Sequence, residues 1–94
     1  MVIHPVEVDG VIFYVKKSDR KNKKYDVFDC NYMYITSYGD LSNDHYYDAF
    51  GEYKHLNHYN ILRRHNYRQR AEVMANGYLA DPYSAHYWNY WTLN

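Results

Sequence analysis

Tyrosine is the feature that most constrains the fold of this chain, because fourteen of its 94 residues are tyrosine. Apolar residues make up 47% of the sequence, but the tyrosines inflate that share and aliphatic side chains are few. The core must therefore be built largely from aromatic rings. Each ring buries a large area and needs a partner or water for any hydroxyl group. A chain of this length is expected to form one domain with one modest core.

The start of the sequence predicts a β-hairpin. Residues 2–8 and 11–17 are rich in β-branched side chains and flank Asp9-Gly10. That dipeptide supplies the positive φ angles of a tight hairpin turn. Pro5 cannot donate a ladder hydrogen bond, so the first strand is expected at an edge of the sheet.

A second hairpin is predicted from residues 25–30 and 32–38, with its turn at residues 29–31. Cys30 lies in an alternating apolar stretch and is expected to be a buried core cysteine rather than a reactive thiol. As the single cysteine of the chain, it excludes an internal disulfide. Between the hairpins, the charged residues 16–24 predict an exposed loop.

The pattern changes at Gly39, where helical signals replace the alternation of strands. Ser42 or Asn43 is suited to cap a short helix that runs to about Phe50 and stops at Gly51. The sequence therefore predicts strands only before this glycine and helices only after it.

A longer helix is predicted to begin at Asn57 or Asn60 and to run to about Ala75, where Asn76-Gly77 would end it. Three of its residues and the residue that follows the stop have a spacing of four, three and four, which predicts a narrow buried stripe: Tyr67, Ala71, Met74 and Tyr78. The remaining positions are basic or amide residues, so most of this helix should be exposed.

The last segment, residues 83–94, is unusually aromatic and has Ser84 as a suitable N-cap for a short helix. So aromatic a segment is expected to close the core or to dock on a partner. We therefore expect one of its two tryptophans, Trp88 or Trp91, to be substantially buried.

These signals together predict an α+β fold in a single domain, residues 1–94. A small antiparallel sheet of three to four strands would occupy residues 1–39. Two to three helices from residues 40–94 would pack on it. The sequence has no run of about 20 apolar residues that would span a membrane, and its start lacks the features of a signal peptide. A protein that is not secreted is expected.

The charges balance to a formal net charge of zero but are distributed in blocks along the chain. Six basic residues lie between Lys16 and Lys24, six acids follow between Asp26 and Glu52, and arginines dominate the long predicted helix. Such blocks indicate self-complementary surfaces or a patch for an anionic partner, and they also occur on ordinary solvated surfaces. The candidate contact residues are the basic ones: Arg63, Arg64, Arg68, Arg70, Lys16, Lys17, Arg20, Lys21, Lys23 and Lys24.

Catalytic and metal-binding patterns are weak. His55 and His58 are three residues apart and His65 is seven further on, but no cysteine pair or carboxylate completes a zinc signature. The serines lie in no nucleophile-elbow context, and the four glycines are scattered rather than gathered in a phosphate-binding loop. We expect no catalytic residues, no cofactor and no metal.

Two binding functions remain. The arginine-rich helix and the lysine-rich loop are compatible with phosphate contacts, and tyrosines on the sheet with base stacking. The zero net charge and the acids in the middle of the chain count against that interpretation. Tyrosine, tryptophan and arginine are also the residues that anchor protein interfaces, and this chain has more aromatic rings than its core needs.

The sequence also resembles a small family of uncharacterised proteins of large DNA viruses and bacteriophages. The resemblance covers about residues 11–91 and is carried by these segments: Lys24-Tyr25-Asp26-Val27, Thr36-Ser37-Tyr38-Gly39-Asp40, His45-Tyr46-Tyr47-Asp48, Leu56-Asn57-His58, residues 63–70 and residues 81–88. The chain departs from the family at Tyr38, where the turn usually carries phenylalanine, and in the more acidic stretch 43–50.

The resemblance implies a virus-encoded protein located in the virion or the host cytoplasm. With the interface-like composition, it favours a non-enzymatic minor capsid or cement-type component. The expected partners are other virion proteins or copies of the same chain. A nucleic-acid-binding accessory protein is the alternative, and no membrane partner is expected.

Overall fold

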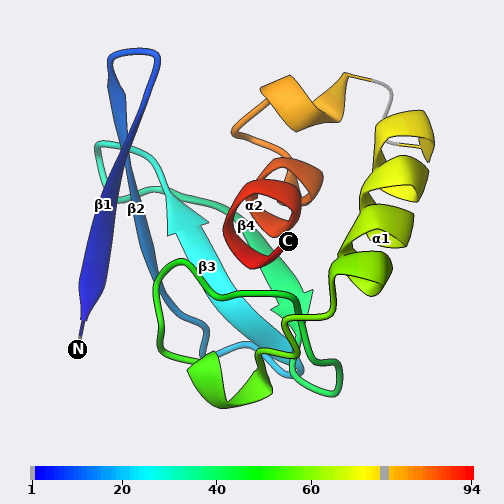
Figure 1. Cartoon of the computed structure of the whole chain (residues 1–94). Coiled ribbons are helices and arrows are strands. Elements are labelled where there is room, and N and C mark those ends of the chain that lie inside the picture. The colour runs from blue at the N-terminus through cyan, green and yellow to red at the C-terminus, as the bar shows by residue number, and fades with distance from the viewer. Residues whose placement is uncertain (1, 75–76) are drawn as a thin grey trace.

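The computed structural model of the protein describes residues 2–74 and 77–94, and it shows an antiparallel sheet followed by helices (Figure 1). The strands lie in the order in which they occur along the chain: β1 (Ile3–Val8), β2 (Val11–Lys17), β3 (Lys23–Phe28) and β4 (Tyr34–Asp40). The second half contains the 3-10 helices η1 (Lys54–Leu56) and η2 (Tyr78–Ala80) and the α-helices α1 (Ile61–Met74) and α2 (Ala85–Leu93). The predicted α+β class is confirmed.

The first hairpin forms as the sequence predicts. Asp9 and Gly10 have φ angles of 49° and 81°, and Val8 pairs directly with Val11 across the turn. Such a turn twists the two strands in the sense that a sheet requires. β1 pairs only with β2 within the four-stranded order, so Pro5 lies on an edge strand as expected.

The second hairpin also forms, but Cys30 is exposed. The Asp29 carboxylate accepts hydrogen bonds from the main-chain N–H groups of Asn31 and Met33, at 2.8 and 2.9 Å, and thereby builds a turn. Strand β3 ends at Phe28, so Cys30 lies in that turn and the prediction of a core cysteine is wrong. The connection between β2 and β3 is shorter than expected, because strand residues occupy both ends of the stretch 16–24.

The short helix predicted between Ser42 and Phe50 does not form. The segment instead runs irregularly and is held by the buried Asp48, whose carboxylate accepts from the N–H groups of Phe50 and Tyr53 and from the Tyr25 hydroxyl. In the predicted helix, the Asp48 carboxylate would lie beside residues of its own helical turn. The contact with a phenol 23 residues away favours the irregular path, because it satisfies a buried charge.

Of the two predicted caps of helix α1, Asn60 is the one that precedes it, and its side-chain oxygen accepts from the N–H group of Arg63. The predicted stripe is only half present: Tyr67 and Ala71 are half-buried, whereas Met74 and Tyr78 are exposed. No residue of α1 is fully buried. The predicted end at Ala75-Asn76 lies outside the described residues, and Gly77 has the left-handed φ of 96°.

Helix α2 completes the core against the inner face of the sheet. Ser84 caps it by accepting from the N–H group of His86, as predicted. Trp88 is fully buried and Trp91 is 55% exposed, which confirms that one tryptophan serves the core. The core cluster contains residues of strands β2 to β4, the residue that precedes η1, and residues of α2: Phe13, Val15, Tyr25, Val27, Tyr38, Tyr53, Trp88 and Leu93.

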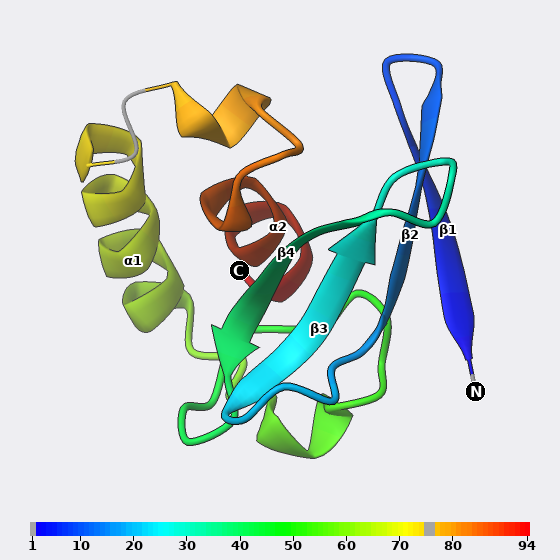
Figure 2. The ribbon, with the colours of Figure 1, turned by 180° about the vertical axis from the view of Figure 1, so that it is seen from behind.

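The two faces of the sheet have different environments (Figures 1 and 2). Helix α2 lies over the inner face, and α1 lies beyond it, beside α2. Figure 2 shows the opposite, outer face with no helix over it. Within residues 2–74 and 77–94, no helix has the length and apolar character needed to cross a membrane.

Candidate contact surfaces

Two of the four arginines of α1 are used inside the molecule. The Nε–H groups of Arg64 and Arg68 both donate to the main-chain oxygen of Asn94, each at 2.9 Å. Their guanidinium groups also lie over aromatic rings, Arg64 over Tyr46 at 4.7 Å and Arg68 over Tyr90 at 5.0 Å. These arginines attach α1 to the body of the domain, and their planar groups suit both kinds of contact.

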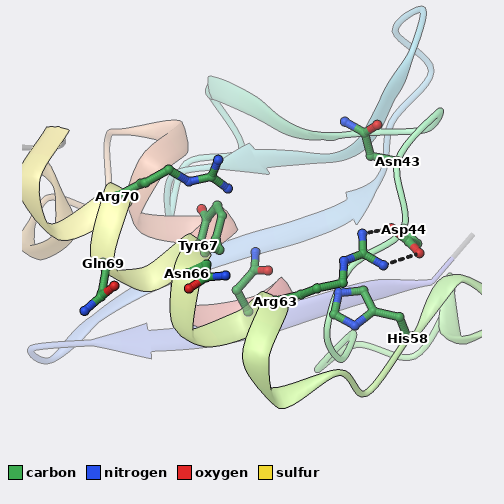
Figure 3. A pocket seen from close by; sticks show the side chains of 9 residues that line it. Asn43, Asp44, His58, Arg63, Asn66, Tyr67, Gln69 and Arg70 are labelled. Atoms are coloured by element: carbon green, nitrogen blue, oxygen red, sulfur yellow. Dashed lines mark hydrogen bonds and ion pairs between the residues drawn. The ribbon is translucent and has the colours of Figure 1, made fainter.

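The other two arginines line an open, polar groove beside α1 (Figure 3). Arg63 makes a bidentate pair with Asp44, with N···O distances of 2.7 and 3.1 Å. This guanidinium keeps the pKa of the Asp44 carboxyl below its usual value. Within the described part of the chain, Arg70 has no hydrogen-bonding or ion-pair partner, and Figure 3 shows it extending over Tyr67.

The α1 groove has a volume of about 590 Å³ and is lined mainly by amide, charged and imidazole side chains: Asn43, Asp44, His58, Arg63, Asn66, Tyr67, Gln69, Arg70 and Asn94. Among the described residues that line it, Asp44 neutralises Arg63, which leaves Arg70 as an uncompensated cation. A surface of this kind forms hydrogen bonds readily but provides little apolar area for tight binding.

The basic residues near the β2–β3 connection do not form one surface together. Arg20 lies over the Tyr34 ring at 4.0 Å, whereas Lys17 lies over the Tyr53 ring at 5.1 Å. Tyr53 belongs to the core cluster beneath the inner face, so Lys17 and Arg20 serve opposite faces of the sheet. Lys21 and Lys23 are exposed, and Lys16 pairs with the nearby Asp19 at 3.3 Å.

Lys24 is not a surface residue, so its assignment to a contact surface is wrong. It is 1% exposed, and its ammonium donates to the main-chain oxygen of Asn43 at 2.8 Å and lies 2.9 Å from Nδ1 of His45. Burial lowers the pKa of Lys24, and the nearby Asp48 opposes that shift. A lysine at the start of a strand normally reaches water, and only the partners from residues 43–48 allow this one to be buried.

A group of aromatic side chains occupies the outer face of the sheet. Tyr14 and Tyr32 stack with ring centroids 4.5 Å apart, and Phe28 packs edge-to-face on Tyr34 at 6.1 Å. These four rings and Ile3 are the outer aromatic face. Tyr32 is 60% exposed, and Ile3 and Tyr34 are each 44% exposed.

The outer aromatic face contains a small apolar hollow. Its volume is about 190 Å³, and it is lined by Ile3, Tyr14, Lys16, Phe28 and Tyr32. The Lys16 ammonium lies 5.7 Å from the Phe28 ring centroid, so the hollow has a cation at its rim. A hollow of this size accommodates one apolar side chain.

The outer aromatic face was not predicted from the sequence, although the alternation of residues along β2 indicates part of it. In β2, Phe13 and Val15 point into the core, so the alternate residue Tyr14 must point outward. The alternation shows that two faces exist but does not show which face the helices leave open.

The histidines do not form a metal centre in the part of the chain that the structure describes, which contains no group of three or more metal-binding side chains. His58 uses its Nδ1 to accept from the N–H group of Asn60, at 2.8 Å, so it stabilises the turn before α1. His55 and His65 are exposed.

Comparisons with protein-family models, with curated protein sequences and with solved structures gave no match for this chain.

Proposed function

We propose that this chain is a non-enzymatic assembly protein that binds a protein partner through its outer aromatic face. Following the sequence resemblance, we place it among minor capsid or cement-type virion components. The observation that carries the proposal is the exposure of Ile3, Tyr32 and Tyr34 around an apolar hollow, on a sheet face that no helix of the described residues covers. Exposed apolar patches of this kind in soluble domains mark interaction sites.

The chemistry of this face suits a protein partner. Aromatic rings beside an arginine are the typical anchors of protein interfaces, and Arg20 lies directly on Tyr34. The hollow would receive one apolar side chain of the partner. The Lys16 ammonium at its rim pairs with the exposed Asp19, and an acidic residue of the partner would take the place of Asp19 there.

The same contacts disfavour a role in base stacking. Tyr32 already covers one face of the Tyr14 ring, and Arg20 covers one face of Tyr34. On α1, Arg64 and Arg68 are bound to Asn94 and Arg63 is paired with Asp44. Few of the basic residues that the nucleic-acid alternative requires are therefore available for phosphate groups.

Site-specific photocrosslinking tests the proposal. A photoreactive phenylalanine analogue is introduced at Tyr32, or at Val73 on α1 as a control that is 81% exposed, in cells that produce the full chain. We expect a discrete protein adduct, with a second copy or another protein, from position 32 only. Adducts with nucleic acid, or equal adducts from both positions, would contradict the proposal.

A pair of matched substitutions identifies the surface. Ile3→Asp places a charge at the hollow, and Ile61→Asp makes the same change at the exposed start of α1. We expect only Ile3→Asp to remove the adduct from position 32, with circular dichroism confirming that both variants fold. Retention on single-stranded DNA that falls steeply with added salt would instead support the nucleic-acid alternative.

A further inference from the structure

The molecule contains a buried polar cluster that joins β3 to the irregular segment between β4 and α1. Lys24 on β3 is 1% exposed, and His45 and Asp48 on the segment are 3% and 1% exposed. We call residues 41–58 the wrap segment, because it runs from the sheet to α2. The N–H group of Leu41 donates to the main-chain oxygen of Asn22, just before β3, and the N–H group of Ala49 donates to the main-chain oxygen of Thr92 on α2.

Hydrogen bonding fixes the protonation state of His45. The Lys24 ammonium has protons to donate and no lone pair, so Nδ1 of His45, at 2.9 Å, must be the acceptor. Nε2 must then carry the proton, and it donates to the side-chain oxygen of Asn57 at 2.6 Å. The main-chain N–H group of Asp48 donates to the same Asn57 oxygen at 2.9 Å, and because that group can only donate, it fixes the orientation of the amide. His45 is therefore a neutral imidazole with both nitrogens engaged.

The charges of the cluster balance only while His45 is neutral. The ammonium of Lys24 is stabilised by the nearby charge of Asp48, whose carboxylate accepts hydrogen bonds from Tyr25, Tyr53 and Phe50. A proton added at Nδ1 of His45 would point at the ammonium and leave a net positive charge in a site that excludes water. Burying such an uncompensated charge is costly, so the segment would move instead.

The surroundings of His45 do not remove this conflict. Asp40 and Asp44 face the cluster from the surface, but Ser42 and Arg63, respectively, are already bound to their carboxylates. His58 lies nearby on the wrap segment, and α2 contributes the main-chain oxygens of Thr92 and Leu93 to the segment. Burial and then the Lys24 charge lower the pKa of His45, whereas Asn57 and Asp48 oppose that shift more weakly.

We propose that Lys24 and His45 form an acid-sensitive latch, in which protonation of His45 releases the wrap segment from the sheet. The direction of the pH effect follows from the linkage between protonation and folding. Because the pKa of His45 is lowered in the closed state, the closed state has its full stability at pH values above the ordinary histidine pKa, near 6.5. That stabilisation is lost as the pH falls below this value. The opening equilibrium constant rises by up to about tenfold per pH unit, because one proton is taken up on opening.

Opening would also change the surface of α1. The wrap segment carries Asp44, which pairs with Arg63, and Tyr46, which lies under Arg64. Release of the segment would therefore free the Arg63 guanidinium group and uncover the hydroxyl of Tyr25. Arg64 would lose the Tyr46 ring but remain bound to Asn94. The latch would make Arg63 available at acid pH but not at neutral pH.

NMR spectroscopy of the full chain tests the latch. At pH 7.5, nitrogen shifts should show His45 protonated at Nε2 and unprotonated at Nδ1. From pH 7.5 to 5.0, the amides of Tyr46 and Ala49, which bind the wrap segment to the main-chain oxygens of Leu93 and Thr92 on α2, should lose exchange protection. The loss should reach up to about tenfold per pH unit after correction for intrinsic exchange. Amides of Val15 and Val27 should keep their protection.

Two variants separate the latch from general acid sensitivity. His45→Gln removes the titrating group and should abolish the pH dependence, whereas His58→Gln, on the same segment, should retain it. If His45→Gln does not fold, the wild-type titration decides the question. Constant protection of Tyr46 and Ala49 from pH 7.5 to 5.0, parallel loss in the sheet, or an unchanged pH profile in folded His45→Gln would overturn the proposal.

Discussion

Helices α1 and α2 lie side by side but are attached to the molecule in different ways. α2 buries Trp88, Tyr90, Thr92 and Leu93, whereas α1 buries no residue completely. α1 is held mainly by polar groups: Arg64 and Arg68 on Asn94, the Tyr67 hydroxyl on Asn89, and Glu72 on the Tyr90 hydroxyl. Apolar burial makes α2 part of the global core, and polar attachment allows α1 to loosen while the core remains folded.

The largest expected effect separates the two tryptophans of α2. Trp88→Ala should lower the free energy of unfolding by about 3–5 kcal/mol, because it leaves a cavity against Phe13 and Tyr38. Trp91→Ala, at a site that is 55% exposed, should cost far less. Urea unfolding of both variants measures the difference, and equal losses would show that α2 is not held by its buried face.

The attachment of α1 is tested by the double substitution Arg64→Ala and Arg68→Ala. Hydrogen bonds from charged groups contribute about 1.5–3 kcal/mol each, and half-burial of these side chains reduces that figure. We expect α1 amides to lose exchange protection while β2 and β3 amides keep theirs. A uniform loss across the domain would mean that α1 belongs to the same cooperative unit as α2.

The two N-caps sharpen the comparison at smaller magnitude. Asn60→Ala and Ser84→Ala each remove a side-chain acceptor at a helix start, at a cost of about 1 kcal/mol. The Ser84 variant should lower the global unfolding free energy, and the Asn60 variant should lower exchange protection in α1 alone. Identical global losses would contradict the distinction between the helices.

The smallest effect is expected at Arg70, which lines the α1 groove without a described partner. Arg70→Ala should change the unfolding free energy by no more than about 0.5 kcal/mol, as is usual for surface substitutions. Thermal unfolding measures it beside Arg68→Ala, the substitution two residues away. A large loss would reveal that Arg70 is a further attachment point of α1.

The elements that were correctly predicted depend on local signals. Asp9-Gly10 determines its hairpin, and Asn60 and Ser84 determine helix starts, through hydrogen bonds and φ angles within a few residues. The prediction of a buried Cys30 failed because of a local turn at Asp29, whereas two other failed predictions depend on distant partners. The segment around Asp48 does not form a helix because Asp48 accepts a hydrogen bond from Tyr25, and Lys24 is buried because Asn43 and His45 accept hydrogen bonds from its ammonium group.

The candidate site could be predicted only in part for the same reason. The four arginines of α1 share one helix, but their roles differ with the tertiary partners Asp44, Tyr46, Tyr90 and Asn94. Alternation along β2 identifies Tyr14 as outward-facing, yet its exposure depends on where the helices pack. Residue type and spacing therefore identified the basic residues but not the surface that is open.

The position of α2 has a consequence for the order in which the chain can fold. The strands β1 to β4 pair as neighbours within the first 40 residues, but Trp88 and Leu93 cover the inner face only after the ribosome has released them. Until then, the rings of Phe13, Tyr25 and Tyr38 would face water on a nascent sheet. Such exposed apolar surface promotes aggregation and binds chaperones. Slow synthesis or an interrupted message would therefore leave a fragment that is prone to association.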